Sequence, residues 1–433
     1  MGNCLRQLAM LSGVAAKRRK FELLAASCLV PLSLGVSEPA LAQSCSPVNT
    51  PGTLTAGNAS TMCMGTFNNT NITFNGPATG TPLLTVTLNP GVSVTSPGGG
   101  AVALSNANVP TANGTSTFIN AIGTTASPII INNTANPGGI NNWGLVNQPG
   151  SAGAAVINAT NTKIDVNGIQ GDNGIWAISY GFSPPNVASV TYDAGTTSGI
   201  TSRGGNSTGI QAENRGAGNA SIDASGNISG NVGTPGGFTF LGLAAVAGST
   251  LGGGGVPPGV PGVGDASVIY RSGTISVLGN FASGIFASAN AGSATITTLP
   301  GTTITVGQEV SSDFLQPAID AFAANGNATA TVASTITING SPAALSTNFR
   351  SNPTGIRATS DPTGSASVIY SGPRHYGPRW GRPRYRCRCR KPRRHDPKRQ
   401  SHRGCLHGHR ADRGRRLQRG RYPRRQRFYT QYR

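Results

Sequence analysis

The sequence predicts an all-β protein in which one short unit repeats along a parallel β-solenoid. Three observations support this class. A tetrad of the form Gly-Ile-x-Ala recurs at intervals near 35 residues, short runs of β-branched residues follow it, and the chain has 61 glycines but only 11% charged residues. A fixed period of this size is typical of solenoids, in which each unit buries its apolar face against its neighbours.

The tetrad is the clearest repeat in the chain. Its full copies occupy residues 174–177, 209–212, 284–287 and 355–358, and looser copies begin at Gly144, Gly242 and Ala318. Successive copies start 30 to 42 residues apart. We expect the isoleucine of each full copy to face a common core, because all four keep the same phase relative to the run that follows; these are Ile175, Ile210, Ile285 and Ile356.

The β-branched runs predict strands. A second run follows about ten residues after the tetrad, as at 189–192 and 294–297, and some units have a third, as at 303–306. Every second side chain in these runs is apolar, which is the pattern of a half-buried strand, and Gly, Asn, Ser and Pro separate them. A disordered Gly/Ser/Asn-rich chain is the alternative, but disorder does not require a constant phase between tetrad and strand.

The N-terminus predicts export. Residues 17–20 are Lys-Arg-Arg-Lys, a stretch that is apolar apart from Glu22 extends from 21 to 36, and Ala40-Leu41-Ala42 precedes Gln43. This arrangement is typical of a signal peptide cleaved between Ala42 and Gln43. Residues 1–42 are therefore expected to be a long leader, with either Met1 or Met10 as the start.

The mature chain is expected to have three parts. Residues 43–115 are interpreted as an N-terminal cap with irregular structure, and residues 116–372 as the repeats. Cys45 and Cys63 are the only cysteines between 43 and 372, so we expect them to form a disulfide near the first repeat. Such a bridge closes a short loop and stabilises by about 3 kcal/mol.

The third part, residues 373–433, differs sharply in charge. Residues 1–372 contain 11 Lys/Arg and 12 Asp/Glu, whereas 373–433 contain 23 Lys/Arg, 2 Asp and all five histidines. One interpretation is a nucleic-acid or polyanion binder, because arginines alternate with aromatic residues. Another is a zinc site, but the potential ligands match no usual spacing; they are Cys387, Cys389, Cys405, His407 and His409.

A third interpretation is that residues 373–433 are translated out of frame. If each codon is read one base late, Arg codons become those of Gly, Ala, Val, Asp or Glu, Tyr becomes Ile, Thr or Met, and Cys becomes Ala or Val. Arg384-Tyr385-Arg386-Cys387 is then compatible with Gly-Ile-x-Ala, 29 residues after the copy at Gly355. This interpretation explains composition and spacing together, and it predicts a disordered basic tail.

Together the leader, the Gly/Asn/Ser/Thr-rich composition and the repeats resemble the passenger region of autotransporter outer-membrane proteins over about residues 17–372. The resemblance implies a right-handed parallel β-helix that serves cell-surface adhesion or autoaggregation. It also implies an outer-membrane location through a C-terminal β-barrel, but this chain departs from the family because no amphipathic ten-residue strands with aromatic girdles follow its repeats. The adhesion ligand is not specified, and no nucleic-acid partner is expected.

Enzymatic alternatives receive little support from the sequence. Residues 43–372 contain no histidine, the usual base for a nucleophile and the commonest metal ligand. A secreted β-helix polysaccharide hydrolase or lyase needs clustered carboxylates, whereas the aspartates are scattered, and Asp313 and Asp320 are expected at solvated turn or helix positions. No catalytic residue, cofactor or metal ion is therefore predicted.

Overall fold

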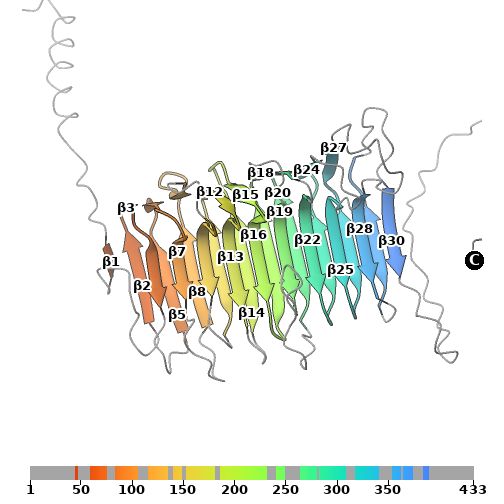
Figure 1. The fold of residues 1–433 in the computed structure, drawn as a ribbon, viewed down its shortest axis with the longest axis horizontal. Helices are drawn as coiled ribbons and strands as arrows, with labels where there is room; N and C mark the ends of the chain where they lie inside the picture. Colours follow the sequence, from red (N-terminus) through yellow and green to blue (C-terminus); the bar gives the residue numbers. More distant parts are fainter. Residues whose placement is uncertain are drawn as a thin grey trace, which may run out of the picture.

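The computed structural model confirms a parallel β-helix (Figure 1). All its regular elements within the described residues are strands. The described residues are 44–46, 59–75, 83–105, 116–134, 140–148, 153–180, 186–231, 240–248, 264–279, 282–308, 317–340, 354–361, 364–373 and 384–389. Ala40, Ala42 and Gln43, at the expected cleavage site, lie outside them.

Three sheets, here called A, B and C, form the walls of the solenoid. Sheet A contains β1 (Ser44–Ser46), β2 (Ala59–Met64), β5 (Leu83–Leu88), β8 (Ser116–Ile122), β11 (Ala155–Thr160), β14 (Val187–Asp193), β17 (Asn219–Ser225), β20 (Ala266–Ser272), β23 (Ala294–Thr298), β26 (Ala328–Val332) and β29 (Ala366–Tyr370). Sheet B contains β4 (Ile72–Asn75), β7 (Gly100–Ser105), β10 (Trp143–Gln148), β13 (Asn173–Ser179), β16 (Ser207–Asn214), β19 (Phe240–Ala247), β22 (Ser283–Ala289), β25 (Ile319–Ala323), β28 (Thr354–Ser360) and β30 (Arg384–Cys389). Sheet C contains β3 (Thr66–Asn68), β6 (Ser93–Thr95), β9 (Ile129–Asn133), β12 (Thr162–Gln170), β15 (Ile200–Gly205), β18 (Ile228–Asn231), β21 (Thr274–Leu278), β24 (Thr303–Gln308) and β27 (Thr335–Gly340).

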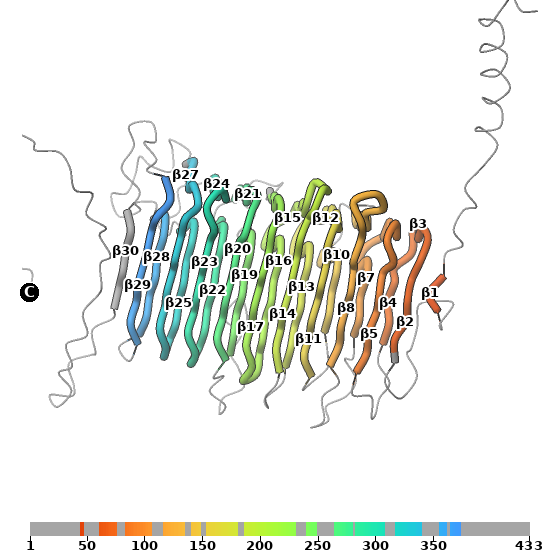
Figure 2. Tube along the Cα trace, turned by 180° about the vertical axis from the view of Figure 1, so that it is seen from behind, coloured from red at the N-terminus to blue at the C-terminus, as the bar shows by residue number. Residues whose placement is uncertain are grey.

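Each 35-residue unit forms one rung of the solenoid. The chain passes through a strand of sheet A, then C, then B, and returns to A one rung further along. The rungs stack from one end of the molecule to the other (Figure 2). Nine rungs with all three strands, from β2–β4 to β26–β28, are present in the described residues.

All seven tetrads lie in sheet B. The register pairs Ile175 with Ile210, and the same column continues through Leu243, Ile285 and Ile319 to Ile356. The four isoleucines of the full copies have no exposed surface. The tetrad therefore marks the sheet B strand of each rung, with its isoleucine in the core.

The tetrad glycine is required because there is no space for a side chain. A Cβ on Gly209 would lie 2.7 Å from the carbonyl oxygen of Gly242 in the next rung and 2.5 Å from Cγ2 of Ile228 in sheet C. Gly174 is in the same situation against Gly209 and Ile200. The backbones of adjacent rungs lie further apart at the copy in which Ala318 replaces glycine. A Cβ on Gly284 would lie 3.1 Å from the Ala318 carbonyl oxygen.

We expect Gly209→Ala to lower the free energy of unfolding by about 2–3 kcal/mol, because a rigid backbone oxygen must move to admit the methyl group. Urea unfolding followed by circular dichroism measures this change. Gly100→Ala is the matched control in sheet B, since its Cβ would meet the Ala103 methyl group at 3.0 Å rather than backbone. A loss at Gly209 no larger than at Gly100 contradicts the steric explanation.

The second and third runs form sheets A and C. The apolar residues alternate inward, and the largest fully buried side chains include Tyr192 and Tyr270 of sheet A. Each hydroxyl group donates a hydrogen bond to a backbone carbonyl, Tyr192 to Thr162 at 2.9 Å and Tyr270 to Gly226 at 3.0 Å. Burial raises the pKa of both tyrosines, so these hydroxyls stay protonated donors.

The expectation of an irregular N-terminal region was wrong in part. Residues 59–105 contain two complete rungs, β2–β4 and β5–β7, in register with the later ones. These rungs lack the tetrad but retain alternating apolar residues, such as Leu84, Val86 and Leu88, which are buried. The alternating pattern is therefore sufficient for a rung where the Gly-Ile signature is absent.

The N-terminal end of sheet A is closed by β1. This strand pairs antiparallel with β2, and Cys45 lies opposite Cys63. The two cysteines form a disulfide and are fully buried. The first rung thus has an outer neighbour in sheet A, where β1 covers β2.

Part of the basic tail differs from the disorder expected for it. Arg384–Cys389 forms β30, which extends sheet B by pairing with β28. The register places Tyr385 beside Ile356 and Cys387 beside Ala358. A single strand can join the sheet because backbone groups, not side chains, make its hydrogen bonds. The tail after Cys389 lies outside the described residues.

Candidate functional site

The outward side chains of the three sheets are the candidates for function, because the interior is filled. Within the described residues no group of three or more His, Cys, Asp and Glu side chains is placed to bind a metal ion. Cys387 and Cys389 lie on β30, whereas Cys405, His407 and His409 lie outside the described residues.

Two carboxylates are buried on the outer side of sheet B, and each is paired with an arginine. Glu213 on β16 is 2.8 Å from Nε of Arg215. Asp320 on β25 accepts hydrogen bonds from two nitrogens of Arg357 on β28. The prediction of a solvated turn or helix for Asp320 was wrong, because it occupies the x position of a tetrad strand and is only 2% exposed.

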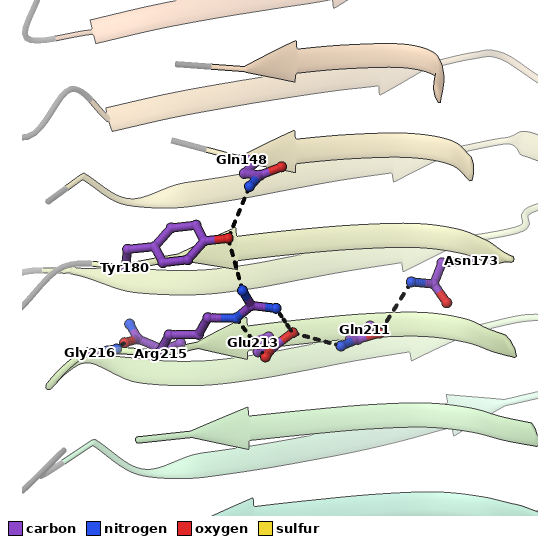
Figure 3. Close-up of polar contacts among 8 residues, drawn as sticks. Gln148, Asn173, Tyr180, Gln211, Glu213, Arg215 and Gly216 are labelled. Carbon is purple, nitrogen blue, oxygen red and sulfur yellow. Dashed lines mark hydrogen bonds and ion pairs between the residues drawn. The ribbon is translucent and has the colours of Figure 1, made fainter. Parts of the chain in front are cut away.

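The ion pair at Glu213 belongs to a longer polar network across three rungs (Figure 3). Gln211 donates to Glu213 at 2.9 Å, and Asn173 of the previous rung donates to Gln211 at 3.2 Å. On the other side Arg215 donates to the Tyr180 hydroxyl at 3.0 Å. That hydroxyl accepts a further bond from Gln148 at 2.9 Å.

The hydrogen bonds of this network hold its side chains in place, and the network does not expose a reactive group. Glu213 and Gln211 are 1% and 4% exposed, and the Arg215 guanidinium also stacks on the Tyr180 ring with a separation of 5.1 Å. A buried carboxylate is tolerated when its oxygens are hydrogen-bonded and a cation neutralises it. The network therefore links β10, β13 and β16 and provides no free carboxylate.

Two tryptophans lie on the same side of sheet B. Trp143 and Trp176 occupy adjacent rungs, and their rings meet edge to face with centroids 5.4 Å apart. Trp143 also donates to the Gly171 carbonyl at 3.1 Å. Both rings are half-buried, so the pair packs on the rung surface.

The outer side of sheet A carries a regular column of hydroxyl groups. It consists of Ser189, Ser221, Ser267, Thr295, Thr329 and Ser367, one from each rung between β14 and β29. A shallow groove of about 430 Å³ follows the first four of these residues across four rungs. Asn219 and Asp265 lie beside the hydroxyls in the groove and are exposed.

The exposed Asn and Asp side chains of this groove also hold the rungs together. The Asn219 side-chain oxygen accepts a bond from the Asp265 backbone N–H at 2.9 Å, and Asp265 accepts one from the Ser293 N–H at 2.7 Å. Ser221 donates to Ser189 at 3.0 Å. These bonds fix the groove as part of a rigid sheet, which favours binding without large ordering costs.

One buried carboxyl group, that of Asp172, forms no ion pair within the described residues. Asp172 lies between β12 and β13 and has no exposed surface. Its Oδ1 accepts the Asn142 backbone N–H at 2.8 Å, while Oδ2 has no hydrogen-bond partner among the described residues. Gly168 and Gly204 leave room for the carboxyl group, because a Cβ on either would collide with it. Burial raises the pKa of Asp172 to about 7, against the lowering effect of backbone hydrogen bonds from Asn142 and Gly168.

This shift makes stability dependent on pH. Unfolded Asp172 loses its proton near pH 4, whereas the folded protein keeps it until about pH 7, so the folded state binds more protons in this window. We expect Asp172 to make its full contribution to the free energy of unfolding below pH 4. Between pH 4 and pH 7 this contribution should fall progressively, by about 2–4 kcal/mol.

Urea unfolding between about pH 4 and pH 8 tests this expectation. Asp172→Asn should remove this part of the pH dependence, because the amide is neutral and still accepts the Asn142 N–H. Asp193→Asn is the control, since Asp193 is exposed on β14. If the free energy of unfolding of Asp172→Asn changes with pH as steeply as that of the parent chain, the pH dependence does not come from Asp172.

The chain matches no protein-family model, no curated protein and no solved structure. No helix in the part of the chain that the structure describes is long and apolar enough to cross a membrane.

Sequence reasoning missed the polar network and Asp172. A signal for the network was present, because Gln211, Glu213 and Arg215 alternate with the inward residues of β16. Alternation identifies a shared face, but it does not show that the face is buried. Asp172 has no comparable signal in a sequence rich in polar turns.

Proposed function

We propose that this chain is an exported, non-enzymatic surface protein whose solenoid serves adhesion or autoaggregation. The observation that carries the proposal is the outer side of sheet A, where a hydroxyl column repeats over successive rungs and one shallow groove spans four of them. A repeated, rigid and polar surface suits binding to an extended ligand on a cell, as solenoid surfaces often do.

The two carboxylates buried in sheet B do not form a pair suited to polysaccharide cleavage. Glycoside hydrolysis requires two carboxyl groups about 5–10 Å apart on either side of the bond. Glu213 and Asp320 lie on strands β16 and β25, which are three rungs apart in sheet B. At about 4.8 Å per rung they are separated by about 14 Å, and each is bound to an arginine.

Adhesion of cells or beads coated with the full chain to bacterial and host-cell surfaces tests the proposal. We expect Ser267→Arg, in the centre of the groove, to lower adhesion about tenfold by blocking the surface. Thr305→Arg is the control, because Thr305 faces outward on β24 of sheet C. Equal adhesion of both variants and the parent chain, or polysaccharide cleavage by the parent, contradicts the proposal.

Export is tested separately on protein recovered from an expressing bacterium. Intact mass should show a chain that begins at Gln43 and carries the Cys45–Cys63 disulfide. Retention of residues 1–42, or two alkylated cysteines in non-reduced material, contradicts export into an oxidising compartment.

A further inference from the structure

Strands β21, β24 and β27 of sheet C carry a regular set of hydroxyl side chains. The three strands are adjacent in the sheet and stack along one wall of the solenoid (Figure 2). Each begins with a hydroxyl residue, an isoleucine and a second hydroxyl residue, and the register aligns them in two columns. The columns, here together called the threonine array, are Thr274, Thr303 and Thr335, and Ser276, Thr305 and Thr337.

The threonine array faces outward. The isoleucines between its two columns lie in the core, since Ile275 and Ile304 have no exposed surface and Ile336 is 9% exposed. Successive side chains of a strand point to opposite sides, so the hydroxyl residues on either side of each isoleucine point away from the core. Thr274 and Ser276 are exposed, and the four threonines of β24 and β27 are partly exposed. The array is therefore in contact with solvent.

The backbone sets the spacing of the array in two directions. Hydrogen-bonded strands lie about 4.8 Å apart, and residues two positions apart on one parallel strand are separated by about 6.6 Å. Threonine is branched at Cβ, which restricts χ1 and favours the same rotamer for side chains in the same backbone environment. The hydroxyl and methyl groups are therefore expected to repeat with the spacing of the backbone.

Ice presents water oxygens at similar spacings. Hydrogen-bonded oxygen atoms of water lie about 2.75 Å apart. In a tetrahedral lattice, two oxygens bonded to the same water are then about 4.5 Å apart, and the repeat along the hexagonal axis is about 7.3 Å. The two spacings of the array differ from these by about a tenth or less. Over three rungs the mismatch along the stack adds up to about 0.6 Å, which side-chain motion absorbs.

The chemistry of the array also suits an uncharged lattice. Strands β21, β24 and β27 contain no Asp, Glu, Lys or Arg, whereas an ionic surface is recognised by charged side chains. Each hydroxyl group both donates and accepts hydrogen bonds, as a water molecule does. A single polymer chain repeats in one direction only and matches at most one column. A ligand that matches both columns must repeat in two directions.

We propose that the threonine array is an ice-binding surface. Its hydroxyl groups hold a first layer of water molecules at positions that continue into the ice lattice, and these waters bridge the protein to the crystal. Because the array covers only three rungs, we expect inhibition of ice recrystallisation rather than a large depression of the freezing point. This inference concerns sheet C and does not depend on the proposed adhesion surface of sheet A.

The proposal is tested by partition of the full chain into a slowly growing ice front and by the size of ice crystals in an annealed frozen solution. We expect the protein to be enriched in the ice and to keep the crystals small, whereas serum albumin at the same concentration is excluded. Exclusion of the folded chain from ice, or retention on crystalline cellulose without enrichment in ice, overturns the proposal.

Two matched arginine variants locate the contact. Thr305→Arg, in the middle of the array, should lower partition into ice about tenfold, because the long side chain keeps the crystal away from the neighbouring hydroxyls. Ser267→Arg places the same side chain on the outer side of sheet A and should leave partition unchanged. The basic tail is common to both variants and cannot cause a difference between them. Equal partition of the two folded variants overturns the assignment to sheet C.

Thr337→Arg, on the last rung of the array, provides a second variant in case Thr305→Arg does not fold. We expect it to lower partition into ice by a smaller factor, because it leaves the hydroxyls of two rungs accessible. In the adhesion assay Ser267→Arg and Thr305→Arg have the opposite expected order, so a failure of either proposal is distinguishable from a failure of the other. Circular dichroism verifies the fold of each variant. If folded Thr337→Arg enters ice as well as the parent chain does, the threonine array is not the ice-binding surface.

Discussion

Replacing Ile210 by aspartate is expected to prevent the solenoid from folding. Ile210 has no exposed surface and lies between Ile175 and Leu243 in the core column of sheet B. An unpaired carboxylate there costs about 5 kcal/mol or more, which is comparable to the total stability of a typical domain. We therefore expect insoluble protein or a far-ultraviolet spectrum without β structure.

Two control variants distinguish the buried charge from general sensitivity to substitution. Ile210→Val removes one methylene group and should cost only about 1 kcal/mol. Thr297→Asp places the same charge on the outer side of sheet A, where Thr297 is partly exposed, and should change stability by less than about 1 kcal/mol. A folded Ile210→Asp variant with near-normal stability contradicts the inward orientation.

The column of inward residues in sheet B shows why the fold could be predicted from this sequence. Inward positions such as Ile175 and Ile285 must be apolar, and stacking requires them to recur once per rung. The tetrad glycines Gly144, Gly174, Gly209 and Gly242 are specified by a backbone collision with the next rung, which keeps glycine at this position of the tetrad. Strong local constraints that repeat at a fixed period can be recognised in one sequence.

Features that occur in only one or two rungs could not be predicted from the sequence. In sheet B the first two rungs fill the core with Ile72 and Phe74, then Val102 and Leu104, instead of the tetrad, so a search for Gly-Ile-x-Ala does not find them. The burial of Asp320 depends on Arg357 in the following rung, 37 residues later. Such pairs are formed by stacking between distant residues, and no local pattern reports them.

The basic tail leads to the prediction with the largest consequence for the chain. Residues 373–433 remain, as a prediction, an out-of-frame continuation of the repeats. The register of β30 is compatible with this, because Tyr385 and Cys387 pair with the tetrad residues Ile356 and Ala358. These are the positions at which a one-base shift permits Ile and Ala. An evolved basic domain has no reason to carry that phase.

Sequencing the gene through and beyond codon 373 is the direct test. A one-base correction near this codon should replace the 23 Lys/Arg of residues 373–433 by a Gly/Asn/Ser/Thr-rich sequence with further tetrads near the established period. If neither shifted frame contains further tetrads, or if the purified tail folds and binds nucleic acid with a sequence preference, the interpretation is wrong.

The corrected protein provides a second measurement. Added rungs would cover Val368 and Tyr370, which are partly exposed at the present C-terminal end. Burial of this apolar surface should raise the urea midpoint of the solenoid. As a control for chain length, a variant lacking residues 390–433 in the present frame should retain the lower midpoint. An equal midpoint for the corrected and present chains contradicts the prediction, because covering an exposed core section must stabilise a stacked repeat.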